Sequence, residues 1–193
     1  MKKIFLASAF VILVLAAFKL AFADSNPFGV TGPTSVPAVG YAFGGGKILS
    51  SERYGVGGVG TGNNFRGVII DATDLAVGGV NGKLNYTNAS NSTKLNTPAN
   101  HRSAYPTGTA SISGYDVVYG PWRLPTKTEL ALFKANKAII NTAPGSTNWY
   151  WSSTPGSANH VWTQNFANGN TYDYLTYYTC FVRTVRDFTA TKH

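Results

Sequence analysis

The chain has 193 residues, of which 44% are hydrophobic and 12% are charged, and this length suits one domain with a leader or at most two small domains. It carries 16 Lys and Arg against 8 Asp and Glu, a formal net charge of +8, which favours anionic partners such as sulfated glycans, surface polymers, DNA or lipid headgroups. The single cysteine, Cys180, excludes an intrachain disulfide, so stability must come from a packed core. We interpret Cys180 as a small buried hydrophobic residue.

Residues 1–23 have the pattern of a signal peptide, which directs export. Two lysines precede a mostly apolar run over residues 4–22, and Ala21-Phe22-Ala23 supplies a small-x-small cleavage pattern. A retained membrane anchor is the alternative, because the run is nearly long enough to span, but Lys19 inside it counts against spanning. We predict cleavage after Ala23, which would leave 13 basic and 8 acidic residues, about +5, in a protein that is not integral to the membrane.

The first half of the mature chain is rich in glycine and proline. Residues 24–40 form a predicted extended arm, and residues 39–49 a short strand interrupted by glycines. The glycine-dense residues 55–62 lack the spacing of a phosphate-binding loop and are interpreted as turns. The clearest strand covers 65–72, where a continuous run of Val and Ile indicates burial on both faces. Residues 81–114 are rich in Asn, Ser, Thr, Pro and Gly, which predicts a long surface loop.

A helix start is encoded by Trp122-Arg-Leu-Pro-Thr-Lys-Thr-Glu-Leu130, which follows a short predicted strand at 115–119. The proline in this segment restricts the preceding residue to extended geometry, so no helix can run through from upstream. Thr126 and Glu129 have the spacing of a capping box, in which each side chain binds the other residue's backbone N–H. Apolar residues recur along one side of the segment that follows, which predicts a helix over 127–139.

The last quarter of the chain alternates short aromatic strands with turns, and Asn168-Gly169-Asn170 is a hairpin signal. Strands are predicted at 149–154, 160–166, 171–178 and 180–188, followed by a tail over 189–193. Short antiparallel strands, one main helix and long loops together predict an α+β fold in a single domain over 41–188.

Several segments resemble, in this order, a family of exported bacterial domains. They are Trp122 to Leu130, Tyr150-Trp-Ser-Ser-Thr154, Trp162 with Phe166 and Gly169, and Val182-Arg-Thr-Val-Arg186 with Phe188, and upstream Gly44 to Leu49 and Gly67 to Asp71 look like its first strands. The family is typified by the C-terminal domain of the Legionella collagen-like adhesin, and the resemblance covers roughly 40–188. It implies a C-type-lectin-like fold whose first and last strands pair. It also implies adhesion, since the typifying member is similar to a trimeric binder of sulfated glycosaminoglycans.

No catalytic or metal-binding constellation is evident in the sequence. His101, His160 and His193 are dispersed, and none has ligand spacing with another histidine or an acid. The acids are scattered, and the acid-Pro-Asn or Gln-Pro-Asp loops of calcium-dependent lectins do not occur. The formylglycine-generating enzymes, which are relatives of the lectin fold, use paired cysteines, whereas this chain has one. We therefore predict a non-enzymatic protein without a cofactor or metal.

Three lysines on the predicted helix form the first part of the candidate binding site. Lys127, Lys134 and Lys137 are related by i+7 and i+3 spacing, which brings them near one another on a helix. Contacts of these lysines with sulfate or phosphate groups would be salt-sensitive. The alternative is an ordinary solvated helix face.

Tyrosines form the second part of the candidate site, in a run too rich in tyrosine to bury every ring. The predicted ligand-binding tyrosines are Tyr172, Tyr174 and Tyr177, with Tyr178 beside them. Sugar rings stack on such faces, and the hydroxyls add hydrogen bonds. The alternative is core packing, which we favour for Trp151 and Trp162.

Three arginines, Arg123, Arg183 and Arg186, lie among apolar residues in the sequence. We expect at least one of them to be structural and paired with Glu129 or Asp187, rather than directed at a ligand.

The leading functional hypothesis is a secreted or cell-surface adhesion domain of a Gram-negative-type bacterium that binds anionic polysaccharide without breaking bonds. The alternative is a structural subunit of an extracellular filament or surface layer, whose arm over residues 24–40 docks as a strand into a neighbour's sheet. A homo-oligomer or polymer is left open, and no specific nucleic-acid partner is expected.

Overall fold

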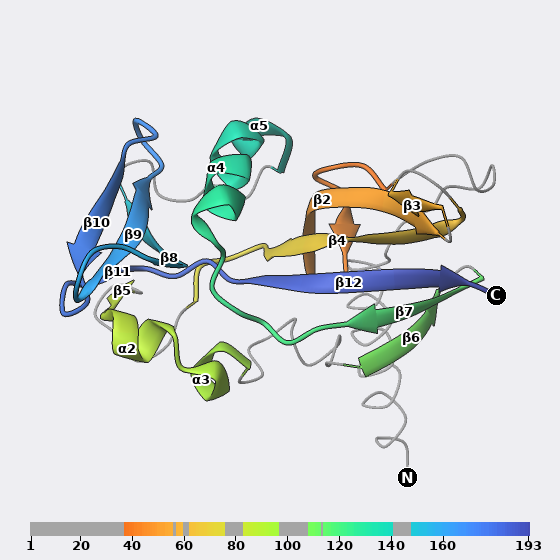
Figure 1. Ribbon diagram of the computed structural model, residues 1–193, viewed down its shortest axis with the longest axis horizontal. Coiled ribbons are helices and arrows are strands. Elements are labelled where there is room, and N and C mark those ends of the chain that lie inside the picture. The colour runs from red at the N-terminus through yellow and green to blue at the C-terminus, as the bar shows by residue number, and fades with distance from the viewer. Residues whose placement is uncertain are drawn as a thin grey trace, which may run out of the picture.

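The computed structural model describes residues 37–55, 57–59, 62–75, 83–96, 108–112, 114–140 and 148–193. The predicted signal peptide and residues 24–36 of the predicted arm lie outside this range. Strand accounts for 50% of the structure and helix for 16%, and the strands form two curled sheets (Figure 1).

The larger sheet, sheet A, has seven strands in the order β1-β2-β4-β12-β7-β6, with β3 paired to β2, and all of its pairs are antiparallel. Its strands are β1 (Ala42–Phe43), β2 (Gly46–Gly55), β3 (Gly58–Val59), β4 (Asn64–Asp71), β6 (Gly108–Ile112), β7 (Tyr115–Tyr119) and β12 (Val185–Lys192). Inward-facing aromatic and aliphatic side chains, such as Phe43, Ile69 and Phe188, fill the concave side of this sheet.

The smaller sheet, sheet B, has five strands in the order β10-β9-β8-β11-β5. They are β5 (Lys83–Leu84), β8 (Trp149–Pro155), β9 (His160–Asn165), β10 (Thr171–Leu175) and β11 (Cys180–Phe181). Only the β8–β11 pair is parallel. The turn between β9 and β10 has Gly169 at φ 83°, a backbone conformation that favours glycine, so the predicted hairpin turn is confirmed.

The main helix, α4 (Lys127–Ala135), begins as predicted. Thr126 Oγ1 accepts a hydrogen bond from the Glu129 N–H at 3.2 Å, and Glu129 Oε2 accepts one from the Thr126 N–H at 2.7 Å. The helix ends earlier than predicted, because the Asn136 side chain donates to the Leu132 carbonyl at 2.9 Å and caps the last turn. A separate short helix follows. The other helices are α5 (Lys137–Ile140), α2 (Tyr86–Ala89) and α3 (Ser92–Asn96).

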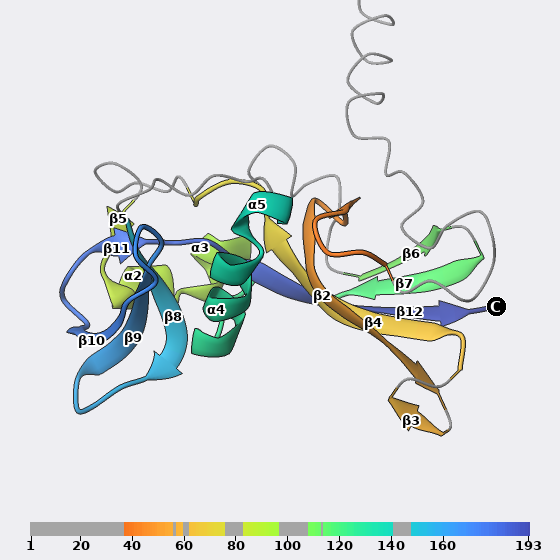
Figure 2. The same ribbon diagram turned by 90° about the horizontal axis from the view of Figure 1, so that it is seen from above.

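Helix α4 lies between the two sheets, as Figures 1 and 2 show from two directions. A hydrophobic cluster joins the three parts around this helix. Its buried members are Leu49, Ile70 and Val185 of sheet A, Leu130, Phe133 and Ile140 of the helices, and Tyr150 and Phe166 from the sheet B side. Because the helix buries side chains against both sheets, it fixes their relative position.

The predicted α+β class is wrong: the protein is mostly β, with two curled sheets and few helices. Glycine-rich segments that look irregular in sequence are strands here, since β2 runs to Gly55 and β6 lies within the predicted loop over 81–114. That loop also contains α2, α3 and β5. The predicted last strand is broken into β11 and β12, and β12 continues through Lys192 into the predicted tail.

The strand pairing implied by the family resemblance also differs. The last strand, β12, pairs with β4 and β7, so that β4 separates it from the first long strand, β2. Within the part of the chain that the structure describes, no helix is long and apolar enough to cross a membrane.

Candidate functional site

The two faces of sheet B carry different side chains. On the β9–β10 pair, Tyr172 lies opposite Thr163 and Tyr174 opposite Val161, while Asp173 lies opposite Trp162. Side chains alternate along a strand, and paired residues share a face. Tyr172 and Tyr174 therefore lie on one face, which we call the tyrosine face, and Asp173 and Trp162 lie on the other, which we call the helix face because α4 packs against it.

Five aromatic rings on the tyrosine face and the turn after β10 form a continuous group, which we call the aromatic patch. Its members are Trp149, Tyr172, Tyr174, Tyr177 and Tyr178. Trp149 contacts Tyr172 and Tyr174 at centroid distances of 5.4 and 5.0 Å. Tyr178 contacts Tyr174 at 5.7 Å and Tyr177 at 4.8 Å. The structure thus places the three predicted tyrosines in one group, and Trp149 is the ring that links two of them.

The rings of the aromatic patch are open to solvent at its ends. Tyr172 is 53% exposed, Tyr177 66% and Tyr178 49%, while Trp149 and Tyr174 are half-buried against the core of sheet B. Burial raises the pKa of Tyr174, and a hydrogen bond with Tyr178 raises the pKa of Tyr177. Tyr174 and Tyr177 therefore keep their hydroxyls for hydrogen bonding at neutral pH.

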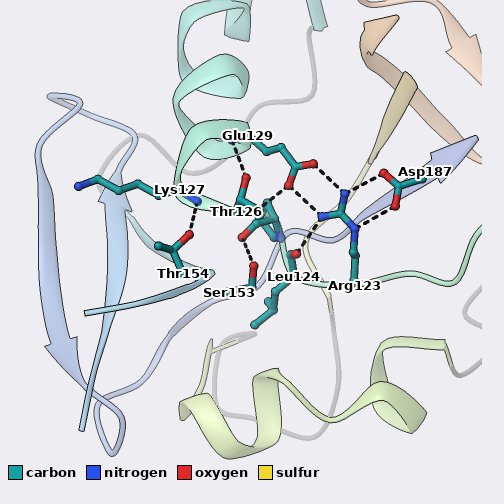
Figure 3. Close-up of polar contacts among 9 residues, drawn as sticks. Arg123, Leu124, Thr126, Lys127, Glu129, Ser153, Thr154 and Asp187 are labelled. Atoms are coloured by element: carbon teal, nitrogen blue, oxygen red, sulfur yellow. Dashed lines mark hydrogen bonds and ion pairs between the residues drawn. The ribbon is translucent and has the colours of Figure 1, made fainter. Parts of the chain in front are cut away.

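The predicted lysines lie on the opposite side of sheet B. The Lys127 ammonium sits 3.2 Å from the centroid of the Trp162 ring, and Figure 3 shows this side chain reaching from the start of α4 toward the sheet. The Lys134 ammonium donates to the carbonyls of Phe166 and Ala167 at 2.8 and 3.3 Å, which fastens α4 to the β9–β10 turn. Both ammonium groups already have partners within the protein, a cation–π contact and two carbonyls.

Lys137 is separated from the other two lysines by the end of α4. It is half-buried at the first position of α5, beyond the Asn136 cap. The three lysines consequently do not share one uninterrupted helix, and the structure does not bring them together with the tyrosines. The assignment of ligand binding to these six residues stays a prediction.

The expectation of a structural arginine is confirmed at Arg123 (Figure 3). Its guanidinium donates to both oxygens of Glu129 at 2.8 and 2.9 Å and to both oxygens of Asp187 at 2.8 and 3.2 Å, and it also donates to the Leu124 carbonyl. Burial alone would raise the pKa of Glu129, but hydrogen bonds from Arg123 and the Thr126 N–H outweigh it, so this pKa is lowered. The hydrogen bond to Glu129, the largest cause, and the one to Asp187 raise the pKa of Arg123.

Arg183 is also structural, and its carboxylate partner was not anticipated from the sequence. The side chain is 1% exposed, and Nε donates to Asp74 at 2.7 Å. Asp74 also accepts from the Tyr150 hydroxyl at 2.8 Å, and burial is the main reason why the pKa of Tyr150 is raised. Because Asp74 follows β4 of sheet A and Tyr150 lies in β8 of sheet B, this buried network ties the two sheets together.

Arg186 is stacked in the core of sheet A. Its guanidinium carbon lies 4.2 Å from the ring centroid of Tyr119 and 5.0 Å from that of Trp122, and the residue is fully buried. Arg123, Arg183 and Arg186 are therefore parts of the scaffold, and none of them belongs to the aromatic patch.

The described residues contain no group of three or more His, Cys, Asp or Glu that could hold a metal ion. Ser157, His160 and Asp173 come together at the β8–β9 turn, where the Ser157 hydroxyl donates to Asp173 at 2.8 Å. However, His160 Nδ1 lies 2.8 Å from the Ala158 carbonyl. A hydrolytic triad requires a hydrogen bond between the histidine and the serine, and here the histidine contacts a backbone carbonyl instead. We therefore interpret these contacts as stabilising the turn. Burial raises the pKa of Cys180 to about 12, and the predicted burial of this residue is confirmed.

Sheet A has one further feature, an open depression of about 440 Å³ across β2, β4 and β12. Its charged lining side chains, Glu52, Arg66 and Asp187, are all engaged in ion pairs, Glu52 with Arg66 and Asp187 with Arg123. With two carboxylates and one guanidinium, the lining of the depression is not cationic and does not favour an anionic ligand, so the aromatic patch remains the stronger candidate site.

Comparison with known proteins gives a match to one family model, described as the Lcl C-terminal domain, over residues 80–186. This span is more than half of the chain and contains the whole of sheet B, α4 and β7. Strands β1 to β4 precede it, although β4 pairs with β12 to complete sheet A. No curated protein matches the chain.

Proposed function

The chain belongs to the Lcl C-terminal domain family, a family of adhesin-type surface domains, and from that premise we propose that it is an adhesion domain whose aromatic patch binds polysaccharide. The proposal includes export through cleavage of residues 1–23 and presentation at the outer surface of a Gram-negative-type cell. It also includes binding without any bond-breaking step.

The observation that carries the proposal is the exposure of the aromatic patch. Three of its rings, Tyr172, Tyr177 and Tyr178, are about half exposed or more, although large aromatic side chains are normally buried. Exposed apolar patches of this kind mark interaction sites. The flat C–H faces of pyranose rings pack against aromatic faces, and phenol hydroxyls can bind sugar hydroxyls at the edge. A tyrosine-rich surface therefore suits a saccharide better than it suits a charged small molecule.

The positive charge supplies a second, less specific contribution. Without residues 1–23 the chain has 13 basic and 8 acidic residues, a formal net charge of about +5, so an anionic polymer is attracted at long range, whatever the contacts at the aromatic patch. Lys127 and Lys134 are engaged with Trp162 and with backbone carbonyls, which leaves Lys137 as the member of the predicted lysine set with the fewest contacts to give up. This electrostatic contribution weakens as salt is added, whereas stacking does not.

The proposal is tested with a variant in which Tyr172, Tyr177 and Tyr178 are replaced by alanine. Its affinity for immobilised heparin and for a neutral polysaccharide such as dextran is compared with that of the wild type by biolayer interferometry. We expect a loss of about tenfold or more, since aromatic contacts contribute roughly 0.5–1.5 kcal/mol each and about 1.4 kcal/mol is tenfold.

Val118→Ala serves as the matched control, because Val118 is an exposed hydrophobic residue on sheet A, 46% accessible and remote from the patch. It should bind as the wild type does. Equal affinity of the triple tyrosine variant and the Val118→Ala variant would show that the aromatic patch does not bind the polysaccharide.

Lys137→Ala separates the electrostatic contribution from stacking. Its affinity for heparin should fall at low salt and equal that of the wild type at high salt, because only a screened charge is removed. The alternative role as a filament subunit relies on the arm over residues 24–40, of which residues 24–36 lie outside the described range, and it stays a prediction.

A further inference from the structure

Strand β10 is the outer strand of sheet B (Figure 1). It pairs with β9 on one side, and no described strand pairs with its other side. The strand reads Thr-Tyr-Asp-Tyr-Leu, a sequence with high β-propensity. It contains no proline, lysine or bulge, which commonly protect an edge, and its one charged residue is Asp173.

The hydrogen-bond pattern identifies which residues of β10 face outward. The Asn165 N–H donates to Asn170 and the Thr176 N–H to Asn159, so the even-numbered residues of this strand exchange their bonds with β9. The N–H and C=O groups of the odd-numbered residues, Thr171, Asp173 and Leu175, therefore point away from the sheet. Among these, the Leu175 carbonyl accepts from the Tyr178 N–H. The Asp173 N–H also interacts with its own carboxylate, and no described strand pairs with the outward groups of Thr171 and Asp173.

We propose that a second copy of this chain pairs with β10 in antiparallel orientation, about a two-fold axis that passes beside Tyr172. In this register Thr171 of each copy lies opposite Asp173 of the other, and these residues exchange both of their outward backbone bonds. The two Tyr172 residues lie opposite each other in the intervening non-hydrogen-bonded pair. The two five-stranded sheets thereby join into one.

Charge selects this register over its neighbours. Asp173 is the only charged residue of β10, and its pKa is lowered by hydrogen bonds from the Ser157 hydroxyl and N–H, so it is a carboxylate at neutral pH. A register centred on Asp173 would place two carboxylates directly opposite each other, which is unfavourable. A register centred on Tyr174 would require the Leu175 carbonyl, which already accepts from Tyr178. The register centred on Tyr172 instead places a Thr171 hydroxyl beside each carboxylate.

The side chains on the tyrosine face support the same register. Tyr172 is 53% exposed in the single chain and would become covered by its counterpart. The aromatic patches of the two copies would then lie on the same face of one continuous sheet. A single pair of short edge strands buries little area, so the pairing is weak in dilute solution and strengthens where chains are crowded on a surface. This inference does not depend on what the aromatic patch binds.

The first test is a disulfide cross-link between full-length chains. In a non-hydrogen-bonded antiparallel pair the Cα atoms lie roughly 4.5 Å apart, within the range that a disulfide spans. A Tyr172→Cys variant, oxidised with glutathione disulfide at high protein concentration, should form a covalent dimer on a non-reducing gel. Cys180 is buried and should not react.

The matched control is Tyr174→Cys, which lies on the same face of the same strand. In the proposed register its two copies are four residues out of alignment, roughly 13 Å along the strand, too far for a disulfide. A dimer from Tyr172→Cys and none from Tyr174→Cys supports the register. Equal cross-linking of both variants, or of neither, overturns it.

The second test changes the charge at position 171, opposite Asp173, without adding a thiol. Thr171→Lys places an ammonium opposite Asp173 and should lower the dimer dissociation constant measured by analytical ultracentrifugation several-fold, whereas Thr171→Asp should raise it several-fold. The same substitutions at Thr109, an exposed residue of the edge strand β6 in sheet A, are the controls and should change nothing. If both variants at Thr171 leave association unchanged, or if the wild type shows no association even at millimolar concentration, the pairing does not exist.

Discussion

Arg123 is the residue that joins the start of α4 to sheet A. It binds Glu129 in the first turn of the helix and Asp187 in β12, and both bonds are bidentate or nearly so. The sequence predicted that at least one of three arginines lying among apolar residues would pair with Glu129 or Asp187. Sequence reasoning could not reveal that one guanidinium serves both carboxylates, because Asp187 is distant in the chain.

Replacement of Glu129 by glutamine tests how the stability contributed by the Arg123–Glu129 ion pair depends on pH. The pKa of Glu129 is lowered in the folded protein, so its contribution to stability is present above its unfolded value of 4.5 and is lost as the pH falls through the folded pKa. At pH 7, Glu129→Gln should reduce the free energy of unfolding by about 1–2 kcal/mol, since the pair is partly solvated. The difference from the wild type should shrink as urea titrations are repeated from pH 5 toward pH 3. A difference that stays constant over this range would show that the carboxylate charge is not involved.

Lys134 and Lys137 differ in what they contact, although the sequence presents them as equivalents. Lys134→Met keeps the aliphatic stem but removes the bonds to the Phe166 and Ala167 carbonyls, and it should lower stability by about 1 kcal/mol. Lys137→Met should change stability by less than about 0.5 kcal/mol, as expected for a surface substitution. Thermal unfolding followed by circular dichroism distinguishes the two. The reverse order of effects would mean that Lys134 is free for a ligand.

At the scale of elements, patterns that are local in the chain were predicted well. The capping box, the strand over β4 and the strands β7, β8 and β9 occur where the sequence placed them. Elements defined by distant partners were missed. Strand β2 looks interrupted because of its glycines, but β4 holds it in place over its whole length, apart from a bulge between Ile48 and Ser50. The helix pattern continues past Asn136, but α4 ends there in a cap in which the Asn136 side chain donates to the Leu132 carbonyl.

Gly67 illustrates why glycine in a strand can be required by a neighbour. A Cβ atom at this position would lie 2.1 Å from the Ser50 carbonyl oxygen and 2.8 Å from the Phe188 ring. Gly67→Ala should therefore cost more than about 3 kcal/mol or prevent folding, because the clash is with the backbone of β2. Gly120→Ala is the control, since its nearest neighbour would be 3.5 Å away, and it should cost less than about 1 kcal/mol. Similar chemical-denaturation midpoints for the two variants would contradict the close packing of β2 on β4.

At the scale of the whole molecule, two sheets are held around one helix, and the predicted binding residues fall on opposite faces of one sheet. The sequence singled out both groups, the lysines and the tyrosines, as candidate binding residues. It could not place them relative to each other, because the face of a strand residue depends on the register with its neighbours. The register pairs Trp162 with Asp173 and not with a tyrosine, so Trp162 and the tyrosines lie on different faces of sheet B. Because the Lys127 ammonium lies over Trp162, Lys127 and the aromatic patch are on different sides.

The two half-buried tryptophans of sheet B report on its two faces. Trp149 contacts Tyr172 and Tyr174 in the aromatic patch, and Trp162 lies beneath the Lys127 ammonium on the helix face. The other two tryptophans, Trp122 and Trp151, are buried. The indole N–H signals of the four tryptophans are resolvable by NMR. The Trp149→Phe and Trp162→Phe variants assign the signals of Trp149 and Trp162.

Titration of the labelled protein with a heparin oligosaccharide, followed through these indole signals, is the most direct test of the aromatic patch as the binding surface. We predict that the Trp149 signal shifts in a saturable manner while the Trp162 signal stays in place. A saturable shift of Trp162 with Trp149 unchanged would assign binding to the lysine side of the sheet and contradict this account.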